Sequence, residues 1–176
     1  MSIDSKDSVR ARIDRSAQSG RMEGMEFEYW IGGGQPPPYY RSDQLRLLDS
    51  GAGDLLVFAR PYWDSAFDPP DLVEKFQRTA DPDEIRRVLN LLLQSDVFSK
   101  PTETEMAGPD VLKTEIMLTF GGVTHERRFH GKIPDELNAL DAVVQALHVS
   151  LAHTGMRSVT HVGKSVVPPP VRVDKR

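Results

Sequence analysis

Apolar and polar residues alternate along the first third of the chain in a way that predicts β-strands. Residues 25–31 place Met, Phe, Tyr and Ile on one face and two glutamates on the other, which is typical of a half-buried strand. Residues 44–48 and 55–60 predict two further strands, and the short turn at 49–54 makes them antiparallel. A short strand over 72–77 can follow.

Two later segments repeat apolar residues at steps of three and four, which predicts helices. The first begins at Asp81, where Pro82 occupies the first helical position and Glu84 completes a capping box, and it continues to about Ser95. The second is opened by Pro134, and Gly155 is expected as its C′ residue. The apolar stripes are Ile85, Val88, Leu89 and Leu92 in the first helix, and Leu137, Leu140, Val144, Leu147 and Leu151 in the second.

Between these helices, Gly121-Gly122 separates two β-rich stretches at 111–120 and 123–130. Adjacent glycines permit the positive φ angles of a tight turn, so this region predicts a β-hairpin. The predicted order is three or four strands, a helix, two strands and a helix. It favours an α+β domain, with an antiparallel sheet of about five to six strands and two helices packed on one face.

Charge divides the chain into an acidic body and two basic ends. Residues 1–21 contain five Lys/Arg and three Asp, residues 156–176 contain five Lys/Arg and one Asp, and residues 22–155 carry a net charge of −10. We therefore predict a polar, disordered N-terminal tail with a short helix near 8–17, a single domain over 22–155, and an extended, proline-rich C-terminal tail. The acidic body argues against binding to duplex nucleic acid, whereas the tails could contact an acidic surface or remain solvated.

No catalytic, cofactor or metal-binding pattern emerges from the sequence. The chain has no cysteine, which excludes disulfides and thiol chemistry, and no apolar run approaches the roughly 20 residues that span a bilayer. The N-terminus shows no secretory signal, so we expect a cytoplasmic protein that has no membrane segment. Gly163-Lys164-Ser165 lacks the first glycine of a P-loop, and the five histidines lack the spacing of a zinc site.

The most distinctive segment runs from Trp30 to Arg41, where three glycines are followed, after one glutamine, by three prolines and two tyrosines. Glycine is the least restricted residue and proline the most restricted, so the segment predicts a shaped loop that presents aromatic rings. A second proline-bearing loop at 61–71 adds three aromatic residues, Tyr62, Trp63 and Phe67. The rings either cap one end of the core or bind a partner, because Tyr, Trp and Arg dominate binding hot spots. The candidate partner-binding residues are Trp30, Gln35, Tyr39, Tyr40, Arg41, Tyr62 and Trp63.

Four short motifs also occur in the order found in one known family. They are Ile31-Gly-Gly-Gly34, Leu91-Leu-Leu-Gln-Ser-Asp-Val-Phe98 followed by Pro101, Gly121-Gly-Val-Thr-His125, and Ile133-Pro-Asp-Glu-Leu137. Over roughly residues 25–151 this layout resembles emfourin-like proteins, which are small bacterial inhibitors of thermolysin-type metalloproteases. The resemblance implies an α+β fold and, as an expectation, protease inhibition.

Two classes of function therefore remain open. The first is a non-enzymatic protein-binding module that uses the glycine/proline-stiffened aromatic loop, with protease inhibition or a place in a larger assembly as specific forms. The alternative is a small-ligand-binding protein or enzyme with a pocket between the sheet and the loops, using His125 or Arg128. An exposed aromatic patch favours the first, whereas convergent polar groups in a closed cavity favour the second.

Overall fold

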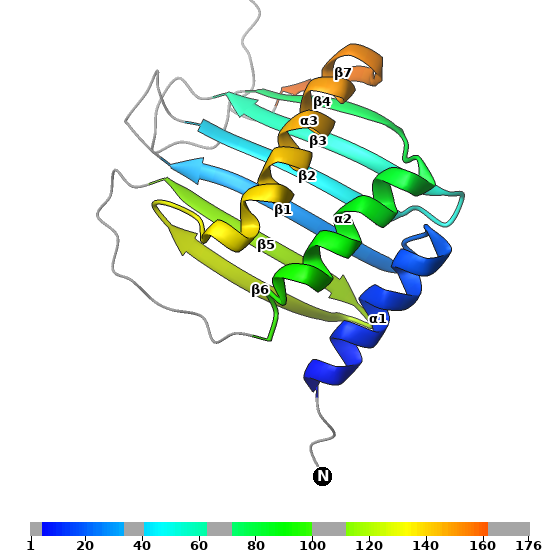
Figure 1. The fold of residues 1–176 in the computed structure, drawn as a ribbon. Coiled ribbons are helices and arrows are strands. Elements are labelled where there is room, and N and C mark those ends of the chain that lie inside the picture. Colours follow the sequence, from blue (N-terminus) through cyan, green and yellow to red (C-terminus); the bar gives the residue numbers. More distant parts are fainter. Residues whose placement is uncertain (1–4, 34–40, 63–71, 100–111, 162–176) are drawn as a thin grey trace, which may run out of the picture.

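The structure, a computed structural model, describes residues 5–33, 41–62, 72–99 and 112–161. Figure 1 shows these residues as one sheet with helices on one side of it. In chain order the elements are α1 (Ser5–Ser19), β1 (Met25–Gly33), β2 (Arg41–Asp49), β3 (Asp54–Tyr62), β4 (Leu72–Thr79), α2 (Pro82–Ser95), β5 (Lys113–Phe120), β6 (Val123–His130), a 3-10 turn η1 (Asp135–Leu137), α3 (Asn138–Thr154) and β7 (Met156–His161).

The predicted α+β class is confirmed, but the sheet is larger than expected. Its seven strands lie in the order β6-β5-β1-β2-β3-β4-β7, and every neighbouring pair is antiparallel. The additional strand is β7, which lies in the segment predicted to be an extended C-terminal tail. Residues 156–161 pair with β4 instead, from Met156 opposite Gln77 to His161 opposite Leu72.

The two faces of the sheet differ in burial because side chains alternate along each strand. In β1 the odd-numbered residues from Met25 to Ile31 are buried, while Glu26, Glu28 and Trp30 are only partly buried. The buried set belongs to one core cluster with residues of α1, α2 and α3. Figure 1 shows these helices on one side of the sheet, and we call this side the covered face and the other the uncovered face. Apolar residues from the covered face and from all three helices form one core cluster.

The N-terminal segment is more ordered than predicted: the short helix expected near 8–17 is present and extends over 5–19, where the rest of the segment was expected to be disordered. Residues 5–19 form α1, which packs against α2 and buries Val9, Ile13 and Ala17. The spacing of these residues, four apart, puts them on one side of a helix. Most helices in proteins are stabilised by packing against other elements, because intrinsic helix propensity alone rarely suffices. For α1 this stabilisation comes from the burial of these apolar residues against α2. Residues 1–21 are mostly polar, and for this reason the narrow apolar stripe that packs against α2 was not recognised from the sequence.

The two predicted helices are present. In α2 the Asp81 side chain accepts a hydrogen bond from the backbone N–H of Asp83, and the Glu84 carboxylate accepts from the backbone N–H of Asp81, which completes the capping box. Pro134 leads into η1, and α3 itself begins at Asn138. Gly155 differs from the prediction: its φ of −80° is not left-handed, because the chain passes directly from α3 into β7.

The hairpin formed by β5 and β6 turns at Gly121 and Gly122, whose φ angles are +57° and +76°. These are the values that a two-residue hairpin turn requires, so this prediction is confirmed. Pro61 and Tyr62 were expected in a loop but extend β3. The pairing of β3 with β2 ends at Ala59, two residues before Pro61. A proline is tolerated at this position because its nitrogen, which has no hydrogen, is not required to donate a hydrogen bond to β2. None of the described helices is long and apolar enough to span a bilayer.

Candidate functional site

The two proline-bearing segments predicted as aromatic loops connect four neighbouring strands. Residues 34–40 connect β1 to β2, and residues 63–71 connect β3 to β4. β1 ends at Gly33, and β2 begins opposite it at Arg41. β3 ends at Tyr62, and β4 begins opposite it. Because β2 and β3 also pair with each other, residues 34–40 and 63–71 leave from the same end of the sheet, which we call the loop end.

The structure locates three of the seven predicted partner-binding residues at or near this end. Trp30 lies in β1, and the backbones of Arg41 and Tyr62 belong to β2 and β3. The other four residues fall outside the described part of the chain. They are Gln35, Tyr39, Tyr40 and Trp63.

Trp30 is partly exposed on the uncovered face and is held in one orientation. Its Nε1 donates to the Oγ of Ser42 at 3.0 Å, and Ser42 is buried. The indole ring lies over the backbone of Gly32, where an added Cβ would fall 1.9 Å from Cζ2 of Trp30. Gly32 is therefore required by the close approach of the ring. A fixed aromatic ring loses little entropy when a partner covers it.

A polar cluster lies on the covered face, two residues below the loop end. Arg60 of β3 donates to both carboxylate oxygens of Asp43 in β2, at 2.8 and 3.2 Å, and the Asp43 side chain is only 7% exposed. A nitrogen of the same guanidinium lies 3.2 Å from Nε2 of His148 in α3. The imidazole ring stacks on Phe58, with 3.6 Å between ring centroids.

A second polar contact ties α3 to the centre of the sheet. The buried Tyr29 donates its hydroxyl proton to Asp141 at 2.8 Å. Burial, together with the hydrogen bond to Asp141, raises the pKa of Tyr29 far above its ordinary value, so the phenol stays protonated. The hollow between Tyr29, Asp43 and His148 has a volume of only about 10 Å³. That is close to the space of a single water and far below that of a small-molecule site.

Sequence reasoning missed both polar contacts. The partners in the Tyr29–Asp141 contact are 112 residues apart, and those in the Arg60–His148 contact are 88 apart. The available signal was weak: Asp43 and Arg60 interrupt strands on the face that is otherwise apolar, and His148 interrupts the apolar side of α3. A charged residue on a core face is usually paired, although its partner cannot be read from spacing.

The residues proposed for the alternative, enzymatic function do not converge. His125 stacks on Phe120 at 5.1 Å between ring centroids, in the row of β6 that belongs to the covered face. Arg128 lies three residues further, hence on the uncovered face, where it pairs with Glu115 at 3.3 Å and Glu126 at 2.5 Å. Arg127 is buried on the covered face over the ring of Phe129. These contacts of His125, Arg127 and Arg128 are with residues of β5 and β6, and they stabilise the hairpin.

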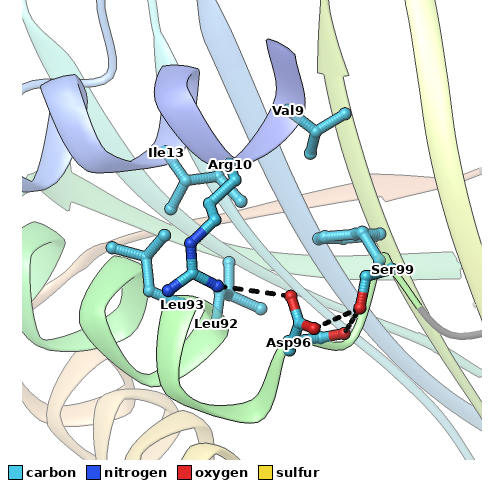
Figure 2. A pocket seen from close by; sticks show the side chains of 8 residues that line it. Val9, Arg10, Ile13, Leu92, Leu93, Asp96 and Ser99 are labelled. Carbon is cyan, nitrogen blue, oxygen red and sulfur yellow. Dashed lines mark hydrogen bonds and ion pairs between the residues drawn. The ribbon is translucent and has the colours of Figure 1, made fainter. Parts of the chain in front are cut away.

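A further hollow lies between α1 and α2, as Figure 2 shows. Apolar side chains of both helices line it, and Arg10 reaches across to Asp96 at 3.3 Å. Its volume of about 20 Å³ also leaves room for little more than one water. Within the described ranges, no group of three or more His, Asp or Glu side chains could hold a metal ion.

The described site is thus a strand end with a fixed aromatic ring, backed by a polar cluster and one small hollow. Compared with known proteins, the chain matches no family model and none of the curated sequences.

Proposed function

We propose that this protein binds another protein through the loop end of its sheet. The observation that carries the proposal is the antiparallel register of β1 to β4, because it makes both aromatic segments leave from neighbouring strands at one end. A partner that approaches this end can meet residues of both segments together. Trp30, fixed by Ser42 and Gly32, adds a rigid aromatic ring close to them.

The small size of the hollow beside the loop end favours a protein partner over a small molecule at this end of the sheet. Sites for drug-sized ligands enclose about 300–1,000 Å³. The hollow beside the loop end holds about 10 Å³, and its polar groups are engaged with one another. Recognition at this end therefore depends on surface contacts, in which aromatic side chains and arginine contribute most.

Inhibition of a thermolysin-type metalloprotease is the specific form of this proposal that the family resemblance implies. A loop stiffened by prolines suits inhibition, because little conformational entropy is lost when it enters a protease cleft. A place as one subunit of a larger assembly is the second form. Both forms use the same end of the sheet.

Capture from the native lysate tests the general proposal. The tagged full-length protein is compared with a Trp30→Ala/Tyr40→Ala variant, and with Val123→Ala as a matched control. Val123 is 54% exposed at the turn between β5 and β6, which is the opposite end of the sheet. A partner retained by the wild type and the control but lost by the double variant supports the proposal. Equal retention by all three proteins refutes it.

A direct titration tests the inhibitor form separately. Increasing amounts of the purified protein are added to a thermolysin-type protease, and cleavage of a small peptide substrate is followed. Stoichiometric inhibition by the wild type and Val123→Ala, with weaker inhibition by the double variant, supports it. Full protease activity at excess protein rejects inhibition and leaves the binding proposal to the capture experiment.

A further inference from the structure

Among the described strands, β6 and β7 have a neighbour on one side only, so they form the two edges of the sheet. The backbone N–H and C=O groups on the outer side of an edge strand can pair with a further strand. Proteins protect such edges with proline, lysine, a bulge or a charged side chain that points inward. The protection that each edge carries therefore shows which of them is open to pairing.

The β6 edge is protected, whereas the β7 edge is not. β6 contains three consecutive charged residues at 126–128, and the middle one, Arg127, is buried on the covered face. β7 contains no proline and no lysine, and it pairs with β4 over its whole length without a bulge. The single arginine of β7, Arg157, is bound to Glu74 of β4 at 2.5 Å.

The side chains of β7 are open to solvent on both faces of the sheet. Residues 156–160 are all exposed, and the two large apolar ones, Met156 and Val159, are 67% and 42% exposed. Met156 pairs with Gln77 on the uncovered face, whereas Val159 pairs with Glu74 on the covered face. A further strand beside β7 would remove part of this apolar surface from water.

We propose that two copies of this chain pair through β7, antiparallel and about a twofold axis at Val159. Such an axis stands perpendicular to the sheet, so the seven strands of each copy continue into one sheet and the helices of both copies lie on the same side. In this register Val159 lies opposite its own copy, and Ser158 lies opposite Thr160. Pairs of β-branched residues and hydroxyl pairs are both favourable across antiparallel strands.

The charges of this region favour a second copy as the occupant of the edge. Residues 22–155 carry a net charge of −10, so most approaches of two copies are opposed, but residues 156–160 contain no carboxylate. The two Arg157 side chains are four residues apart along the paired strands, which is about 13 Å. That separation exceeds the Debye length of about 8 Å at physiological salt, and each guanidinium is already paired with Glu74.

The dimer carries two loop ends that point in opposite directions. β7 runs toward the loop end of its own copy, because its last residue pairs with Leu72 at the start of β4. Antiparallel pairing reverses this direction in the second copy. Each loop end is then free to hold a partner of its own. That consequence rests on the proposed function, whereas the dimer is tested on the isolated protein and stands or fails separately.

Sedimentation velocity of the full-length protein over a series of concentrations tests the dimer. We expect the mass of the wild type to double as the concentration rises. Val159→Lys places two ammonium groups opposite each other across the axis and should weaken association by about tenfold or more. Val149→Lys is the matched control and should associate like the wild type. Val149 is 57% exposed, on the side of α3 opposite the buried Leu147 and Leu151.

Chemical cross-linking tests the register of the pairing. The chain has no cysteine, so Val159→Cys carries a single thiol in each copy. A short bifunctional thiol reagent should link this variant into covalent dimers, because residue 159 meets its own copy. Val149→Cys, treated in the same way, should remain unlinked.

The wild type and the cysteine variants keep the inference falsifiable if Val159→Lys folds poorly. A wild type that remains monomeric at every concentration overturns the inference. A dimer that Val159→Lys retains in full does so as well, because the copies would then meet at another surface. Equal cross-linking of the two cysteine variants, or none in either, contradicts the axis at Val159.

Discussion

The pairing of Arg78 with Glu84 is expected to make a measurable contribution to stability. Arg78, near the end of β4, donates to both carboxylate oxygens of Glu84 at 2.8 and 2.6 Å, and the two side chains are 21% and 23% exposed. The same carboxylate accepts from the backbone N–H of Asp81 at 3.0 Å. Glu84 therefore fastens the sheet to α2 and caps the helix with one side chain.

The Arg78–Glu84 pair should stabilise the folded state by more than an exposed ion pair and by less than a fully buried one. Exposed ion pairs contribute about 0–1 kcal/mol, and breaking a fully buried pair costs about 3–5 kcal/mol. At this partial exposure we expect Glu84→Ala to lower the free energy of unfolding by about 2 kcal/mol, which corresponds to a loss of about 4–8 °C in Tm for a chain of this size. In a double-mutant cycle with Arg78→Ala, the coupling energy should be about 1–2 kcal/mol.

The stabilisation by the Arg78–Glu84 pair should also depend on pH, and it should weaken in acid. The hydrogen bond from Arg78 lowers the pKa of Glu84 below its ordinary 4.5, although burial opposes the shift. A lowered pKa in the folded state means that the stabilisation is fully present above the unfolded value. It is lost as the pH falls through the folded value. The coupling energy should therefore decline as the pH falls below the ordinary pKa of a glutamate.

Urea denaturation followed by circular dichroism measures all four proteins of the cycle at each pH. Lys132→Ala is a control, since Lys132 and Asp135 form an ion pair with both side chains more than three-quarters exposed, at 79% and 77%. It should leave the free energy of unfolding essentially unchanged, because solvent and salt screen an exposed ion pair. A coupling energy near zero at neutral pH, or one that persists unchanged after Glu84 has been protonated in acid, would refute the reasoning.

Two further predictions concern residues near the proposed site. Gly32→Ala should cost about 1–3 kcal/mol of unfolding free energy and change the tryptophan fluorescence, because the new methyl group overlaps the ring of Trp30. In a Trp30→Ala background the same change should cost less than about 0.5 kcal/mol; an equal cost in both backgrounds would contradict the ring contact. Tyr29→Phe should lower stability by about 1–2 kcal/mol by removing the bond to Asp141. Because the pKa of Tyr29 is raised above its ordinary 10.0, the native protein and Tyr29→Phe should show the same phenolate absorbance on alkaline titration until they unfold, and an additional phenolate signal in the native protein would contradict the assignment.

The candidate site was predicted only in part. Trp30 and the proline-bearing segments are conspicuous in the sequence because glycine, proline and aromatic residues have strong local preferences. These segments lie at the same end of the sheet because of the order in which the strands pair. That order cannot be predicted from any local sequence pattern. The Asp43–Arg60–His148 cluster could not be predicted, since strand alternation and helical spacing show which face a residue occupies but not which distant residue it meets.

The sequence by itself determined the features that depend on neighbouring residues. Alternation defined β1, the capping box at Asp81 defined the start of α2, and Gly121-Gly122 defined the hairpin turn. Tertiary structure alone decided that α1 packs on α2 and that β7 joins the sheet beside β4. These elements are polar or short, so their stability comes from contacts with residues far along the chain. Such contacts form only when the whole core assembles. The sequence could therefore suggest a short helix near 8–17 but not its packing on α2, and it gave no indication that residues 156–161 join the sheet.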